Sequence, residues 1–204
     1  MKKLLIAILL LLLCSCCSIQ QRADFPVSLI SVTHQIWFAD GSDCNSVAVG
    51  PHTILTASHC VDKNTSSLAV DSKDKVVPVK HKTYDTKDHV IVILGYTFKN
   101  WASISQQPLQ LGQEVFIAGA PGRLDQLYRT GVYSGLSHVG SRAVMMMFQL
   151  PSFYGDSGSA IFNQQGEIIT TITCIASLSD NHDYIGFACA YPLSFSTQQL
   201  EHIQ

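Results

Sequence analysis

The stretch from Val49 to Cys60 reads Val-Gly-Pro-His-Thr-Ile-Leu-Thr-Ala-Ser-His-Cys. Its Gly-Pro pair is a turn signal, and the short β-branched run that follows is typical of a strand. Similar runs recur along the chain, each bounded by turn residues. They are Ser46–Val49, Val76–Val79, Val90–Leu94, Glu114–Ala118, Ala143–Phe148, Ala160–Phe162 and Ile168–Ile175. Many short strands at this spacing predict an all-β fold, a sandwich or a barrel. A helical period occurs only at Ser194–Ile203.

The composition fits one folded domain of ordinary size. The 204 residues are 47% hydrophobic and 14% charged, which is too apolar for a disordered chain. The net charge is -2 and no basic run occurs, which argues against nucleic acid as a partner. No His-x-x-x-His spacing is present, and Cys44, Cys60, Cys174 and Cys189 show no Cys-x-x-Cys spacing, so we expect no metal and no cofactor.

The N-terminus has the layout of an export signal. Met1–Lys3 is positive, and Leu4–Leu13 is an unbroken apolar run. Ten residues are too few to span a bilayer, which needs about 20, but they match the core of a signal peptide. Because this is the single long apolar run, a polytopic membrane protein is excluded.

The residues that follow are more specific. Leu13-Cys14-Ser15-Cys16 resembles a bacterial lipoprotein signal, which implies that residues 1–15 are removed and Cys16 is lipidated. Residues 16–24 would then tether the protein to a membrane, the outer membrane if the cell is Gram-negative. The alternative is a plain secretory signal.

Export places the chain in a compartment where disulfides form. The first three cysteines lie in the signal and tether. Four remain in the folded part: Cys44, Cys60, Cys174 and Cys189. Four cysteines allow three pairings, and spacing alone does not choose among them.

A second motif, Gly155-Asp-Ser-Gly-Ser-Ala160, lies about 100 residues after Ala57-Ser-His-Cys60. In this order, the two motifs resemble those of the chymotrypsin-like (trypsin-like) serine peptidases, in particular the compact bacterial and viral branch. The resemblance implies two antiparallel β-barrels with the active site between them. The peptidase domain would be residues 25–204, with the first barrel at roughly 25–105 and the second at roughly 106–204.

By the same resemblance, Ser157 is the nucleophile and His59 the base that takes its proton. The acid that orients the histidine precedes a buried strand, and Asp88 before His89–Leu94 fits best. Asp85 is the alternative, expected on the surface and nearly neutral to replacement. The backbone N–H groups of Gly155 and Ser157 map to the oxyanion hole.

The resemblance also bears on the cysteines. Cys44 lies sixteen residues before Cys60, a spacing that family members often bridge. Cys174 and Cys189 would fall on neighbouring strands, where a bridge departs from the usual family pairs. Two buried free thiols are the alternative there.

The resemblance implies that the substrate pocket is lined by Pro151, Ser152, Thr173 and Ala176. None of these carries a charge, so we expect an uncharged residue before the cut bond. The strand at Ile172–Ala176 should pair with the substrate backbone.

Asp156 holds the position at which animal relatives pair a new N-terminus after zymogen cleavage. The segment Phe25–Trp37 has no Ile-Val-Gly-Gly activation sequence. A buried carboxylate needs a partner, and we expect Arg129, with Arg123 as the alternative. The protein would then be active as exported.

The sequence therefore predicts an exported, lipid-anchored serine endopeptidase that acts as a monomer on proteins or peptides through an acyl-enzyme. A non-catalytic binding protein on the same fold is the main alternative. An esterase with the same triad is a third.

Overall fold

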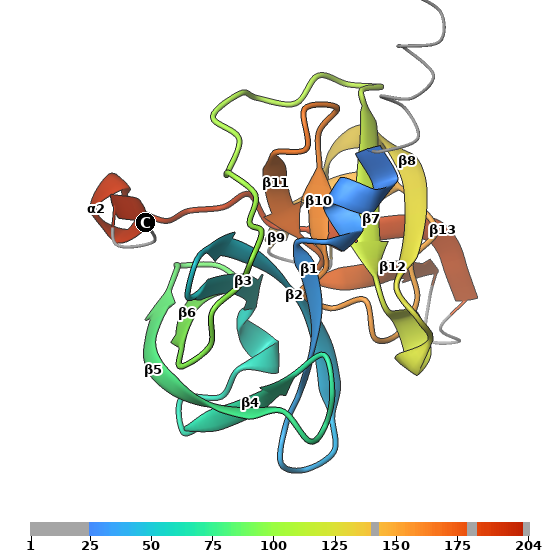
Figure 1. Ribbon diagram of the computed structural model, residues 1–204. Helices are drawn as coiled ribbons and strands as arrows, with labels where there is room; N and C mark the ends of the chain where they lie inside the picture. The colour runs from blue at the N-terminus through green and yellow to red at the C-terminus, as the bar shows by residue number, and fades with distance from the viewer. Residues whose placement is uncertain (1–24, 140–142, 179–182, 202–204) are drawn as a thin grey trace, which may run out of the picture.

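The computed structural model describes residues 25–139, 143–178 and 183–201, and its first half is a closed barrel (Figure 1). The six strands pair antiparallel in the order β1-β2-β3-β6-β5-β4, and β4 closes on β1. They are β1 (Thr33–Trp37), β2 (Asp43–Gly50), β3 (Thr53–Ala57), β4 (Ser67–Val70), β5 (Val76–Tyr84) and β6 (His89–Leu94).

The second half is a seven-stranded antiparallel sheet in the order β11-β10-β7-β8-β9-β13-β12. Its strands are β7 (Glu114–Gly119), β8 (Leu127–Val139), β9 (Ala143–Gln149), β10 (Ala160–Phe162), β11 (Ile168–Thr171), β12 (Cys174–Leu178) and β13 (Asp183–Ala190). Two 3₁₀ turns, η1 (Ser58–Cys60) and η2 (Pro121–Arg123), and the helix α2 (Thr197–Glu201) complete the described elements. No helix within these residues is long and apolar enough to cross a bilayer.

The expected all-β architecture of two packed β-units with a short C-terminal helix is confirmed. The second unit differs in that its two edge strands do not pair with each other in the described sheet. Only Ile172 and Thr173 separate β11 from β12, so the chain runs on instead of folding back. The helix covers the middle of the expected segment, whose last residues, 202–204, lie outside the described part. The signal, the tether and Cys16 also lie outside it.

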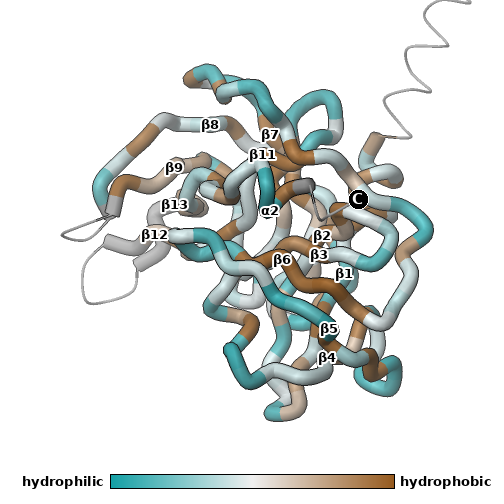
Figure 2. Tube along the Cα trace, turned by 90° about the vertical axis from the view of Figure 1, so that its left-hand side faces the viewer, coloured by the Kyte–Doolittle hydropathy of each residue, from teal (hydrophilic) through white to brown (hydrophobic). Residues whose placement is uncertain are grey.

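Three strands of the first barrel, β2, β3 and β6, are buried on both faces. Ala48, Ile54 and Val92 point into the barrel, whereas Val47 and Leu55 pack against the second unit. Because successive side chains of a strand point to opposite faces, burial of both faces requires a continuous apolar run. Figure 2 shows this as strong hydrophobic colour along β6.

The chain enters the described structure through a helical segment at residues 25–30, which packs on the second unit (Figure 1). The ring of Phe25 meets that of Phe116 edge-on at 5.0 Å between centroids. Leu29 is buried in the core shared by the two units. The first residues of the domain are therefore held both by β7 and by the core between the two units.

A buried ion pair joins the barrel to the second unit. Asp85 and His89 have no exposed side-chain surface, and His89 Nδ1 lies 2.7 Å from Asp85 Oδ2. His89 Nε2 lies 3.2 Å from Thr170 Oγ1, which donates its own proton to the Tyr191 carbonyl. Both ring nitrogens of His89 therefore have a polar partner. The backbone N–H and the hydroxyl of Ser194 also donate to Asp85.

The expectation that Asp85 lies on the surface is therefore wrong. Burial disfavours the charged form of Asp85. Hydrogen bonds from His89, the charge of its ring and the amides of Lys87 and His89 outweigh burial and lower the pKa of Asp85 from 3.8 to about 2. Replacement of this residue cannot be neutral, because it leaves the buried His89 Nδ1 and the Ser194 N–H and hydroxyl without their acceptor.

We predict that Asp85→Ala lowers the free energy of unfolding by about 3 kcal/mol, the usual cost of removing one partner of a buried pair. Because the folded-state pKa lies below the unfolded value, the stabilisation is complete above about pH 4 and is lost as the pH falls towards 2. Urea unfolding between pH 2 and 7 measures both effects.

The exposed Asp74 supplies the control, and Asp74→Ala should change stability by less than about 0.5 kcal/mol. Equal stabilities of the two variants at pH 7 would contradict the assignment of Asp85.

Candidate active site

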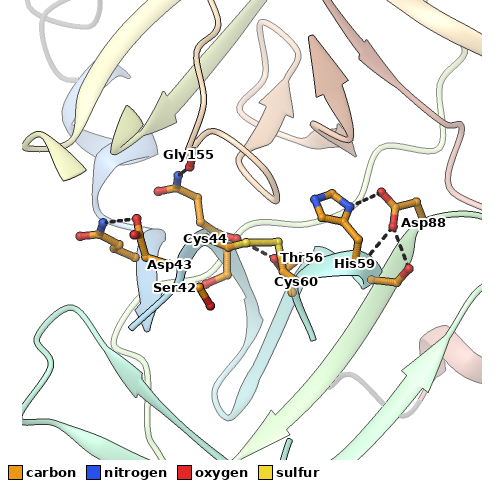
Figure 3. The surroundings of a disulfide bond; sticks show 12 residues. Ser42, Asp43, Cys44, Thr56, His59, Cys60, Asp88 and Gly155 are labelled. Carbon is orange, nitrogen blue, oxygen red and sulfur yellow. Dashed lines mark hydrogen bonds and ion pairs between the residues drawn. A yellow bond between two sulfur atoms is a disulfide. The ribbon is translucent and has the colours of Figure 1, made fainter. Parts of the chain in front are cut away.

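The end of β3 presents His59 to Asp88. The 3₁₀ turn η1 follows β3, and the Ser58 N–H donates to the Asp88 carbonyl at 3.0 Å. His59 Nδ1 lies 2.7 Å from Asp88 Oδ2 (Figure 3). The His59 N–H and the Ser58 hydroxyl donate to the other carboxylate oxygen at 3.0 and 2.8 Å. The imidazole is thereby held through Nδ1, which leaves Nε2 as the atom able to take a proton.

The two members of this pair differ in exposure. The His59 side chain is 45% exposed, whereas that of Asp88 is 13% exposed. Burial disfavours the charged form of Asp88, but hydrogen bonds from His59 and Ser58 outweigh it and hold the pKa of Asp88 below its ordinary value. Asp88 is therefore ionised at neutral pH and can stabilise a protonated His59.

Both expected disulfides are present. Cys44 in β2 bonds to Cys60, the residue after His59, and so ties the histidine turn to a neighbouring strand (Figure 3). Cys174 bonds to Cys189, its partner in the register of β12 and β13. The free-thiol alternative for Cys174 and Cys189 is therefore wrong. Two disulfides are typical of a protein from an extracellular or periplasmic compartment.

The loop that carries Ser157 is pressed onto the first barrel. The Asn45 N–H donates to the Ser157 carbonyl at 2.8 Å, and the Gly158 N–H donates to the Ile172 carbonyl at 2.9 Å. Gly158 has a φ of +80°, and a Cβ there would lie 2.1 Å from the Asn45 oxygen and 3.2 Å from Ala57 N. Only glycine fits, and this close approach places Ser157 beside the strand end from which His59 projects.

Within the described residues, no hydrogen bond joins Ser157 Oγ to His59 Nε2. The structure thus brings His59 and Asp88 into direct contact and places Ser157 on the adjoining loop. In enzymes without a bound substrate, contacts between reacting side chains are often long and tighten only when the substrate binds.

Two backbone N–H groups of this loop, those of Gly155 and Ser157, are the expected oxyanion donors. The Tyr154 carbonyl accepts a hydrogen bond from Gly122 N at 2.9 Å, and because a trans peptide is planar, the Gly155 N–H points the opposite way. Neither the Gly155 N–H nor the Ser157 N–H donates to an acceptor within the described part of the chain. The two residues expected at an oxyanion hole therefore each keep an N–H without a protein acceptor.

Asn45 is the functional residue that the sequence did not reveal. It is 1% exposed, and its amide donates to the Gly155 carbonyl at 2.6 Å while its Oδ1 accepts from the Ala120 N–H at 3.0 Å. Its carbonyl accepts a hydrogen bond from Thr56 Oγ1 at 2.6 Å. Asn45 therefore fixes the loop that carries Ser157 to β3 and to the end of β7. Its position directly after Cys44 is the one signal that could have pointed to it.

Asp156 has the internal partner that was expected. Both of its oxygens accept from Arg129 at 2.6 Å, and Phe153 N and Ser152 Oγ donate to Oδ2 at 2.8 and 3.1 Å. The carboxylate is fully buried. Arg123, the alternative partner, pairs instead with Asp43. A fully satisfied Asp156 holds the start of the nucleophile loop without a chain terminus.

The expected pocket residues come from two segments. Pro151 is exposed and Ser152 is buried, both at the start of the nucleophile loop, and the Ser152 hydroxyl faces Asp156. Thr173 lies just before β12 and Ala176 lies in the middle of it, and both are half-buried. Thr173 Oγ1 is buried and has no partner within the described residues. No group of three or more metal-ligating side chains lies in the described part of the chain.

Comparison with known proteins gives the class. A model of the trypsin-like peptidase domain matches residues 44–170, more than half of the chain, from the start of β2 to the end of β11. The chain therefore belongs to the trypsin-like peptidase family. No curated protein sequence matches the chain.

Solved structures of the Rv3671c protease from M. tuberculosis have a similar fold. Its inactive form is 14% identical with a TM-score of 0.70, over 88% of this chain and 92% of that one. Its active form is 15% identical with the same TM-score, over 88% and 83%. At these identities the likeness concerns the fold.

We predict that Arg129→Ala lowers the free energy of unfolding by about 3 to 5 kcal/mol, because it leaves the buried Asp156 carboxylate without its cation. Arg129→Lys keeps the positive charge but cannot make the bidentate contact with Asp156. Its loss of stability should therefore be smaller than that of Arg129→Ala. Denaturant unfolding measures the series, with the exposed Lys99→Ala as control. A loss of less than about 1 kcal/mol in Arg129→Ala would show that the pair does not hold the loop.

Proposed function

We propose that this trypsin-like peptidase is a serine endopeptidase that uses His59, Asp88 and Ser157. The observation that carries the proposal is the ion-paired contact of 2.7 Å between His59 and Asp88, beside a loop that presents Ser157 and two N–H groups without protein acceptors. Nothing else in the described part of the chain combines a partly exposed histidine, a buried carboxylate and a nucleophile.

The chemistry follows from this arrangement. Ser157 Oγ attacks the scissile carbonyl as His59 Nε2 takes its proton, and Asp88 stabilises the imidazolium. The carbonyl oxygen becomes an oxyanion that accepts hydrogen bonds from the Gly155 and Ser157 N–H groups. His59 then gives its proton to the leaving amine, which breaks the peptide bond and leaves Ser157 acylated. Water, activated by the same histidine, hydrolyses this ester.

The substrate enters as an added strand. β12 is the last strand of its sheet, so one of its edges has no neighbour among the described strands. An extended peptide can pair with this edge, which leads the residue before the cut bond towards Pro151, Ser152, Thr173 and Ala176. Because the Ser152 hydroxyl is turned to Asp156 and no charge lines this set, the substrate residue there is uncharged.

The enzyme is active as exported, because Arg129 already satisfies Asp156 and no freed N-terminus is needed. The two disulfides agree with an exported protein. The lipid anchor at Cys16 remains our proposal from the sequence motif.

We expect Ser157→Ala and His59→Ala to lower kcat by about a millionfold and Asp88→Ala by about ten thousandfold. His81→Ala, an exposed histidine on β5, is the control and should keep full activity. The measurement is hydrolysis of a peptide library together with labelling by a fluorophosphonate. A wild-type protein that is neither labelled nor hydrolytic would favour the non-catalytic alternative, and hydrolysis of esters without peptides would favour an esterase.

We expect mass spectrometry of the mature protein to find acyl chains on Cys16. Cys16→Ser should release the protein from membranes or leave it unprocessed, since a lipoprotein is held by several chains. Cys17→Ser is the matched control and should remain membrane-bound. An unmodified N-terminus beyond residue 16 in the wild type would exclude the anchor.

A further inference from the structure

The 3₁₀ turn η2 is bound to the first barrel through one strained residue. Arg123 has a φ of +67°, which is uncommon for a residue other than glycine. Its Nε donates to Asp43 Oδ1 at 2.8 Å and its Nη2 to the Gly41 carbonyl at 2.8 Å. The guanidinium also lies 5.4 Å from the centre of the Trp37 ring. A backbone in this conformation persists only where its surroundings hold it.

The same turn touches the nucleophile loop. Gly122 donates its N–H to the Tyr154 carbonyl at 2.9 Å, and a Cβ on Gly155 would lie only 2.6 Å from Gly122 N. The peptide between Tyr154 and Gly155 is therefore fixed by Gly122 on its carbonyl side. Its other side carries the Gly155 N–H, one of the two proposed oxyanion donors.

We propose that Asp43 and Arg123 are positioning residues for the oxyanion hole. Their ion pair holds Arg123 in its left-handed conformation, which keeps the Gly122 N–H on the Tyr154 carbonyl and thereby aims the Gly155 N–H. This inference rests on the proposed peptidase function. It assigns to a residue of the first barrel control over a donor in the second.

Asp43 is itself well held. Its side chain is 9% exposed, and its second oxygen accepts from Gln35 Nε2 at 3.1 Å. The aspartate is thus fixed from the barrel side and serves as the anchor. The arginine, whose side chain is 56% exposed, is the part that moves when the ion pair is lost.

Loss of the ion pair between Asp43 and Arg123 should lower kcat and leave KM nearly unchanged, because an oxyanion donor acts mainly on the transition state. A peptide p-nitroanilide is the substrate to use, since it places no amino acid beyond the cut bond where Arg123 could touch it. Loss of a whole donor costs about a hundredfold or more, so we expect about a tenfold fall in kcat for Arg123→Ala and Asp43→Ala, with KM changed less than twofold.

Three comparisons make this specific. Lys73→Ala is the matched control, because Lys73 also lies over the Trp37 ring, at 4.4 Å, and should leave kcat unchanged. Arg123→Gly should recover part of the loss, since glycine adopts a positive φ without strain. The double variant Asp43→Ala/Arg123→Ala should be no worse than either single one. Asp43→Asn, which keeps an acceptor oxygen, replaces Asp43→Ala if that variant does not fold.

A second readout does not need catalysis. Hydrogen exchange of the Gly122 amide, followed by NMR, should become faster in Arg123→Ala and Asp43→Asn and stay unchanged in Lys73→Ala. Unaltered exchange in Arg123→Ala, additive losses in the double variant, or an equal fall of kcat in Lys73→Ala would each overturn the proposal. Failure of the proposed function is a different result, namely a wild type without hydrolysis and with a protected Gly122 amide.

Discussion

Three consecutive residues at the start of β2 each hold one of the three segments that form the candidate site. Asp43 binds the turn behind Gly155, Cys44 is covalently joined to the residue after His59, and Asn45 anchors the loop that carries Ser157. β2 is itself fixed between β1 and β3 in a closed barrel, where every strand has two neighbours. A short segment thus positions His59, the loop that carries Ser157 and, through Arg123 and Gly122, the proposed oxyanion donor Gly155.

The structure contains two aspartate–histidine pairs whose aspartates, Asp85 and Asp88, are close in the sequence. They illustrate how burial distinguishes a structural pair from one able to take part in chemistry. Both have an Nδ1 to carboxylate distance of 2.7 Å. The pair of Asp85 and His89 is closed on all sides, with its second ring nitrogen bound to Thr170, so it can only brace the two units. The pair of His59 and Asp88 has an imidazole that is nearly half exposed. In the proposed mechanism, this exposure is what lets His59, unlike His89, transfer a proton to a substrate.

Features that depend on local sequence patterns could be predicted from the sequence alone. Short apolar runs predicted the strands, and the motifs at His59 and Ser157 predicted the family. Prediction from the sequence failed where a residue's surroundings come from distant parts of the chain. Asp85 looked like a surface residue because Ser194, more than a hundred positions later, is what covers it. Asn45 was missed for the same reason, since Gly155 lies 110 residues away.

The internal ion pair of Arg129 and Asp156 also determines when the loop that carries Ser157 becomes ordered. A cation that belongs to the same domain cannot be withheld once the chain has folded, so folding itself orders the nucleophile loop. Under the proposed function, the compartment in which the chain folds then determines where the active site is completed. Cys44 and Cys60 must be oxidised to secure the histidine turn, and a reducing cytosol does not allow this. Under the proposed function, the redox state of the surroundings thereby controls where the histidine turn is secured.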